Sequence, residues 1–207
     1  GITRLPALRS IKAKRAELRL GLWSLITGDP VVDRITFIEP VIEATSNYEG
    51  DPGGSASGKK SSITSVISRA PVNQVYLERA EIIVSGPSAR ETFSDVTAKL
   101  LLDPSGSHAA RGTFKWRDQS LSFIYEGGTP ESQANTTRFP IQLGLSGTLV
   151  SADIEGQVNI GSNVRVVGDM TLDIGSLPRF AGWTGMLVPE DQNRGAFAAE
   201  GAFHWMG

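Results

Sequence analysis

Apolar and polar side chains alternate at a period of two along most of this chain of 207 residues. In residues 16–22, the even positions are Ala or Leu, whereas Glu17 and Arg19 occupy odd positions. Successive side chains of a β-strand point to opposite faces of the sheet, so each such segment predicts a strand with one apolar and one polar face. Roughly ten such segments indicate a mainly β protein dominated by an antiparallel sheet. Clear examples are residues 121–125, 137–145, 150–160, 164–174 and 197–205.

Helix is scarce in this pattern. Residues 22–26 predict at most one helical turn, and residues 62–69 predict a short amphipathic helix. Residues 176–186 predict the best helix, with Ser176 as N-cap and Pro178 in the first turn. The 23 glycines and 11 prolines also disfavour an all-helical bundle. Because the predicted helices interrupt the strands rather than alternate with them, a parallel β-α-β fold is not expected.

Residues 49–61 contain no apolar side chain larger than alanine. Nothing in this segment offsets the entropy of ordering it, so it predicts a flexible loop. The stretch of about 48 residues before it is too short to bury a good core alone. We therefore expect a single β-rich domain over residues 1–207, with a flexible loop at residues 49–61 inside it.

A short pattern, A-A-x-G-x-F-x-W, occurs twice, at residues 109–116 and 198–205. On a strand, its Gly, Phe and Trp are two residues apart and line one face together. This spacing suggests a repeated sheet element. Its Gly would admit a bulge or a close neighbour, while Phe and Trp would fill the concave side.

Few residues are available for catalysis or metal binding. The chain has no cysteine, which excludes disulfides and cysteine–zinc sites, and its two histidines, His108 and His204, leave little for a metal enzyme or a triad. It has no G-x-S-x-G motif either. Alternation points His204 away from its aromatic neighbours, which predicts a solvated side chain. We therefore expect neither an enzyme nor a bound metal or cofactor.

Two further patterns have ordinary structural explanations. Residues 53–59 match G-x-x-x-x-G-K, but Lys60 stands where a P-loop needs Ser or Thr, and no helix is expected to begin there. Asp169 and Asp173 share one strand face but lie roughly 13 Å apart, too far for a paired acid and base, so they indicate a solvated sheet face. The net charge of −2 indicates no nucleic-acid partner.

Basic residues dominate the first 19 positions, where six Lys or Arg accompany only Glu17. They form either a membrane-facing patch, if an anchor precedes Gly1, or a solvated strand face. The longest apolar stretch, residues 20–28, is far shorter than the roughly 20 residues needed to span a bilayer. Because the chain begins at Gly1 and stops after a strand-like run, we expect a fragment of a longer protein.

Residues 17–40, ELRLGLWSLITGDPVVDRITFIEP, resemble the N-terminal region of AsmA family proteins. In that region a strand, a helical turn ending in Gly, a V-x-x-I strand and a terminal Pro follow in this order. Residues 95–100 (DVTAKL) and 112–123 (GTFKWRDQSLSF) are similar to the paired sheet strands of the family. Residues 169–183 (DMTLDIGSLPRFAGW) continue the resemblance through a strand and a short helix, so that it covers nearly the whole chain.

The resemblance implies a periplasmic protein attached to the inner membrane of a Gram-negative bacterium by one N-terminal helix, which would lie outside this chain. It also implies a long, curved antiparallel sheet. The concave apolar groove of that sheet would conduct or shield lipids on the way to the outer membrane, as in bridge-like lipid transfer proteins. The absence of cysteine fits an oxidising periplasm.

Together these observations predict a non-enzymatic cell-envelope protein that binds phospholipid or other acyl chains along an apolar groove. An uncovered apolar sheet face needs acyl chains, a helix or another domain to cover it. The alternative is a β-sandwich interaction or assembly module, in which two sheets close the core and no lipid binds. Alternation predicts ten groove-lining residues: Leu18, Leu20, Phe114, Trp116, Phe123, Leu143, Ile154, Val166, Leu172 and Phe203.

Overall fold

The computed structural model describes residues 7–21, 32–45, 72–86, 89–133, 136–161, 163–187 and 195–206. The predicted loop and the first two predicted helices lie outside these residues. In chain order the elements are β1 (Ala7–Lys12), β2 (Arg15–Leu20), β3 (Val32–Ile38), β4 (Val41–Thr45), β5 (Val72–Ser85), β6 (Arg90–Leu102), β7 (His108–Trp116), β8 (Gln119–Gly127), β9 (Glu131–Gln133), β10 (Thr136–Gly147), β11 (Ser151–Ile160), β12 (Val164–Ile174), α3 (Leu177–Thr184) and β13 (Phe197–Met206).

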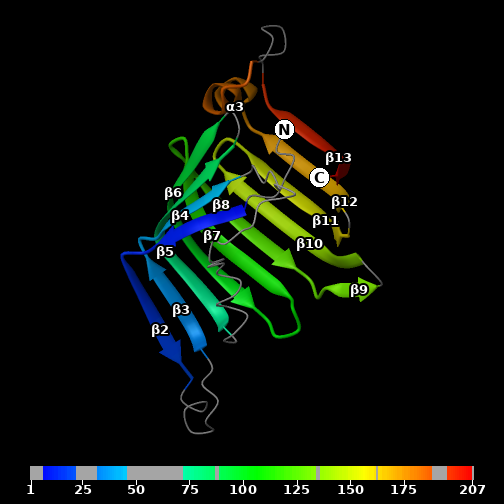
Figure 1. The fold of residues 1–207 in the computed structure, drawn as a ribbon. Coiled ribbons are helices and arrows are strands. Elements are labelled where there is room, and N and C mark those ends of the chain that lie inside the picture. Colours follow the sequence, from blue (N-terminus) through cyan, green and yellow to red (C-terminus); the bar gives the residue numbers. More distant parts are fainter. Residues whose placement is uncertain are drawn as a thin grey trace, which may run out of the picture.

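All 13 described strands belong to one open, curved sheet (Figure 1). Its main path runs β1-β4-β5-β6-β7-β8-β10-β11-β12-β13, with β2 and β3 beside β5 and β9 beside β10. The prediction of a mainly β protein is therefore confirmed. The described strands do not form the two stacked sheets of a sandwich.

Alternation predicts an antiparallel sheet, but the sheet in the structure is mixed. Both β3 and β4 pair in parallel with β5, whereas all other pairs are antiparallel. Residues 46–71 connect β4 to β5 and are long enough for the crossover that parallel strands require. The short connections between later strands allow only antiparallel neighbours.

A line of backbone irregularities bends the sheet near its N-terminal end. Glu39 between β3 and β4, Arg79 on β5 and Asp95 on β6 all have positive φ, at 49°, 51° and 50°. Glu39 also separates β3 from β4, and its carboxylate accepts hydrogen bonds from Arg79 at 2.8 Å and Lys14 at 3.2 Å. Bulges of this kind increase local twist and redirect strands. Accordingly, β1 and β4 run in a different direction from β2 and β3 (Figure 1).

Close backbone contact between β11 and β12 depends on two glycines. Gly156 and Gly168 lie directly opposite each other in the register. A Cβ atom on Gly168 would overlap the Glu155 carbonyl oxygen and approach the Gly156 Cα within 2.6 Å. Glycine in a strand interior often marks such a close backbone approach.

The predicted helix at residues 176–186 is confirmed as α3, the one helix among the described residues. Ser176 occupies the N-cap position in an extended conformation but its side chain makes no capping hydrogen bond. Gly185 ends the helix in the left-handed region, at φ 76°, and its N–H donates to the Ala181 carbonyl. No helix in the described part of the chain is both long and apolar enough to cross a membrane.

Candidate functional site

One face of the sheet collects the apolar side chains, and we call it the apolar face. Its central row runs from Tyr125 on β8 through Leu143 and Ile154 to Met170 on β12, each directly opposite the next. Directly opposite residues on neighbouring strands share a face of the sheet. Because α3 packs on the same face, the helix covers one end of it. The opposite face, which carries Asp169 and His204, is the polar face.

Nine of the ten residues predicted to line a groove share the apolar face by register. The tenth, Leu20, lies beyond a register shift. Arg19 and Leu20 are consecutive on β2 and pair with Arg34 and Val32, so the extra residue, Asp33, is on β3. A bulge changes the alternation of the strand that carries the extra residue, which leaves Leu20 on the same side of β2 as Leu18. The nine residues that the register places on the apolar face are Leu18, Phe114, Trp116, Phe123, Leu143, Ile154, Val166, Leu172 and Phe203.

Burial of the apolar face is uneven, and one buried cluster, formed by Ala80, Val96 and Ala98, includes no residue of α3. Beneath the helix, Leu121 and Ile174 are only 4% and 3% exposed and pack against Phe180 and Trp183. Away from it, Leu143 is 36% exposed and Leu18 is 66% exposed, although both lie on the same face. The described residues thus leave a large part of the apolar face in contact with solvent.

Aromatic rings join β6, β7 and β8 to α3. Phe114 contacts Phe93 at 5.6 Å and Phe123 at 6.1 Å between ring centroids. Trp116 contacts Trp183 of α3 edge to face at 4.8 Å, and the Trp183 Nε1 donates a hydrogen bond to the Trp116 carbonyl. Edge-to-face rings add to the stabilisation that burial alone provides. Sequence reasoning missed Phe93 and Trp183 because their neighbours come from distant segments.

The two copies of the A-A-x-G-x-F-x-W pattern lie on β7 and β13, with Phe and Trp on the apolar face, as predicted. Their glycines differ. A Cβ on Gly112 would approach the Ala98 Cα within 2.9 Å, so this glycine has the close neighbour that the pattern suggested. A Cβ on Gly201 would meet nothing within 4 Å, so Gly201 has no close neighbour that requires glycine.

A charged cluster fixes the tip of the β7–β8 hairpin to α3. Arg117 donates to the Glu91 carboxylate at 2.6 Å and to the Thr184 carbonyl at the end of the helix. The Trp116 Nε1 donates to the same carboxylate at 2.8 Å. These bonds, first from Trp116 and then from Arg117, lower the pKa of Glu91 below its ordinary value. Charge-assisted bonds of this kind are stronger than neutral ones.

Replacing Glu91 by Gln should lower stability at neutral pH and leave it unchanged in acid. The pKa of Glu91 is lowered by folding, so its stabilisation is present above the ordinary carboxyl pKa, about 4.3, and is lost as the pH falls through the lower folded value. Urea unfolding of both proteins from pH 7 to pH 3 measures this. A stability difference that stays constant across that range would contradict the assignment.

A histidine–tyrosine pair lies at the end of β7 and β8 far from α3. The His108 Nε2 lies 2.7 Å from the Tyr125 hydroxyl, and its Nδ1 lies 3.1 Å from the Gly106 carbonyl. Because a carbonyl can only accept, Nδ1 donates to the Gly106 carbonyl, and in the neutral ring Nε2 then accepts from the Tyr125 hydroxyl. Burial raises the pKa of the Tyr125 hydroxyl. Gly127 leaves room for the pair, since a Cβ there would lie 2.5 Å from Nε2.

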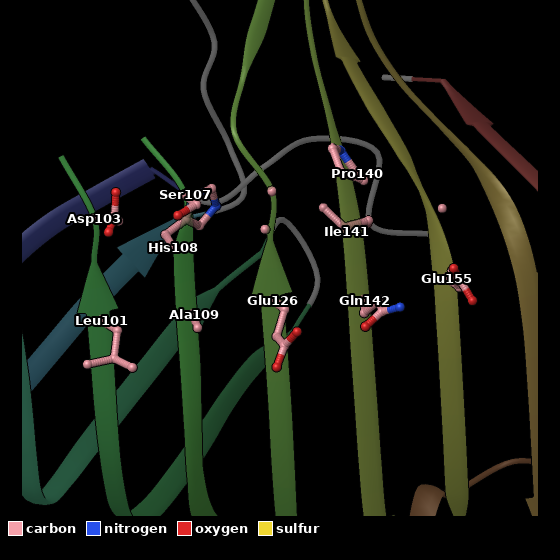
Figure 2. A pocket seen from close by; sticks show the side chains of 13 residues that line it. Leu101, Asp103, Ser107, His108, Ala109, Glu126, Pro140, Ile141, Gln142 and Glu155 are labelled. Carbon is pink, nitrogen blue, oxygen red and sulfur yellow. The ribbon is translucent and has the colours of Figure 1, made fainter. Parts of the chain in front are cut away.

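A hollow of about 540 Å³ opens on the polar face (Figure 2). Leu101 and Ala109 lie on one side of it, and Glu126, Gln142 and Glu155 come from the next strands. Three carboxylates line it, those of Asp103, Glu126 and Glu155, and so do Ser107 and His108. The His108 nitrogens face the Gly106 carbonyl and the Tyr125 hydroxyl, and the Ser107 hydroxyl lies 3.4 Å from that of Ser105, so no serine–histidine pair forms there. No group of three metal-ligating side chains occurs among the residues that the structure describes.

The remaining predicted features are exposed on the polar face or lie outside the described residues. Asp169 and Asp173 are exposed on the polar face, and Asp169 lies opposite Glu155, which fits a solvated surface rather than an acid–base pair. His204 is exposed on the same face. The near P-loop at residues 53–59 lies outside the described residues.

Comparisons with protein-family models, curated proteins and solved structures gave no match. The resemblance to AsmA proteins therefore stays a prediction from the sequence.

Proposed function

We propose that this chain is a non-enzymatic protein that binds the acyl chains of phospholipids or other lipids on the apolar face. The observation that carries the proposal is the partial exposure of that face. Leu143 lies in the middle of an apolar row, yet more than a third of its surface is in contact with solvent. Large exposed apolar surfaces of soluble domains commonly mark binding sites.

The dimensions of the apolar face suit an acyl chain. Strands β8, β10, β11, β12 and β13 are consecutive neighbours, so their side chains span four inter-strand steps, about 19 Å in total. One leaflet of a bilayer holds its acyl chains within about 15 Å. An acyl chain laid across these strands would cover the row formed by Tyr125, Leu143, Ile154 and Met170 and displace water from it. Removing apolar surface from water contributes about 25 cal/mol per Å².

The cellular setting that we propose is the periplasm. In that setting the apolar face serves as a lipid-binding groove, and an anchor outside this chain holds the protein in the inner membrane. Lipid passing along the groove would contribute to outer-membrane biogenesis. The support for this setting is the AsmA-like order of segments in residues 17–40 and 169–183.

Binding of a fatty-acid probe tests the proposal. We expect the purified protein to bind a fluorescent fatty acid and to retain phospholipid or fatty acid in native mass spectrometry. Leu143→Glu should weaken probe binding roughly tenfold or more, because a carboxylate buried beside an acyl chain has no partner. Ile124→Glu is the matched control, since Ile124 is 59% exposed on the polar face of the neighbouring strand.

Two results would overturn the proposal. One is a protein that neither carries lipid nor binds the probe. The other is an equal loss of probe binding in Leu143→Glu and Ile124→Glu, which would mean that the probe does not use the apolar face. Circular dichroism of each variant checks that both still fold.

A further inference from the structure

Among the described residues, the strand at the C-terminal edge of the sheet has few of the features that block pairing with another chain. β13 pairs with β12 over its whole length without a register shift, and no described strand lies on its other side. Its sequence, FAAEGAFHWM, contains no Lys, Arg or Pro. Natural proteins use charged residues, especially Lys, and Pro, together with bulges and short strands, to prevent an edge from pairing with another chain. An edge of ten residues with no register shift and no Lys, Arg or Pro can accept a further strand.

The opposite edge of the sheet has the features that β13 lacks. The strands at that edge, β1 and β2, are six residues long each and do not pair with each other. A register shift interrupts the pairing of β1 with β4 and that of β2 with β3. Basic residues such as Lys12, Lys14 and Arg15 lie along it. The contrast indicates that association is blocked at one edge of the sheet and permitted at the other.

The residues of β13 are complementary to a second copy of the same strand. In an antiparallel pair with Ala202 opposite itself, Glu200 lies opposite His204 of the second copy, and the reverse pair forms by symmetry. A histidine N–H donates to a carboxylate whether or not the ring is charged. On the apolar face, Phe203 lies opposite Gly201, and Trp205 opposite Ala199, so large side chains face small ones.

Other registers lose this complementarity. A shift that places odd residues opposite even ones joins the apolar face of one copy to the polar face of the other. A pair centred on Gly201 sets Glu200 opposite Ala202, and a pair centred on Phe203 sets Glu200 opposite Met206. Neither forms the two charge-assisted pairs.

We propose that two copies of this chain associate through β13, antiparallel and with the two-fold axis at Ala202. The pairing joins two sheets edge to edge and makes their apolar faces continuous. It does not require a bound lipid. Because a single strand edge buries less surface than a standard interface, the dimer is a weak one, with a Kd in the micromolar range or above.

Opposite changes at one position test the charge pairing. His204 faces the uncharged Val167 within its own chain, so its replacement alters no charged pair directly opposite in the monomer. His204→Lys should tighten the dimer, whereas His204→Glu places two like-charged pairs in the interface and should loosen it. Roughly a fivefold change in Kd in each direction is expected. Sedimentation equilibrium at micromolar concentrations measures all three proteins.

Disulfide trapping tests the register, and the absence of natural cysteine makes it clean. Ala202→Cys places two cysteines opposite each other and should form a covalent dimer under mild oxidation. Ala198→Cys is the matched control: Ala198 and Ala202 are both exposed, on the same face, and each lies opposite an Asp of β12. In the proposed dimer the two copies of residue 198 are about 27 Å apart. Equal trapping of both variants, a protein that stays monomeric at every concentration, or a dimer indifferent to both His204 changes would overturn the proposal.

Discussion

Trp183→Ala is expected to lower the free energy of unfolding by about 3 kcal/mol, the lower end of the usual cost for a buried aromatic side chain, because Trp183 is partly buried. Trp183 packs edge to face on Trp116 and on Phe180, with ring centroids 4.8 and 5.7 Å away. Its Nε1 also donates to the Trp116 carbonyl at 3.0 Å. The alanine variant loses the ring contacts and the hydrogen bond together, and α3 loses its main attachment to β7. Urea unfolding followed by far-ultraviolet circular dichroism measures the change.

Trp183→Phe separates the two contributions. The smaller ring keeps part of the contact with Trp116 and Phe180 but cannot donate the hydrogen bond, so an intermediate loss of about 1 to 2 kcal/mol is expected. If the alanine variant unfolds at the same urea concentration as the parent protein, then α3 does not stabilise the covered end of the apolar face. In that case Leu121 and Ile174 would owe their burial to something other than this helix.

Alternation predicts which side chains share a face because it needs only local geometry. Nine of the ten predicted lining residues follow it. Opposite the tenth, Leu20, the register shifts because β3 carries an extra residue, Asp33, and nothing in the local sequence marks that bulge. The parallel pairing of β3 and β4 with β5 could not be predicted either, because alternation shows which face a side chain is on but not the direction of the strand.

Contacts between distant segments could not be predicted from the sequence. Trp183 could be assigned to a helix, but its packing on Trp116 depends on where that helix lies on the sheet. Likewise, Tyr125 and His108 belong to two strands whose register sets the distance between the rings. The positive φ angles of Glu39 and Asp95 fall on residues with no preference strong enough to predict them.

Gly168→Val is expected to destabilise the protein by 3 kcal/mol or more, roughly the cost of overpacking combined with a displaced backbone. Its Cβ would overlap the Glu155 carbonyl oxygen, and backbone atoms of a paired strand cannot move aside without breaking ladder hydrogen bonds. Gly201→Val is the matched control on the next strand, because nothing lies within 4 Å of its Cβ. Valine favours strands, so this variant should unfold at the same urea concentration as the parent or a higher one. Equal stability of the two variants, measured at low protein concentration, would show that β11 and β12 do not approach as closely as their glycines allow.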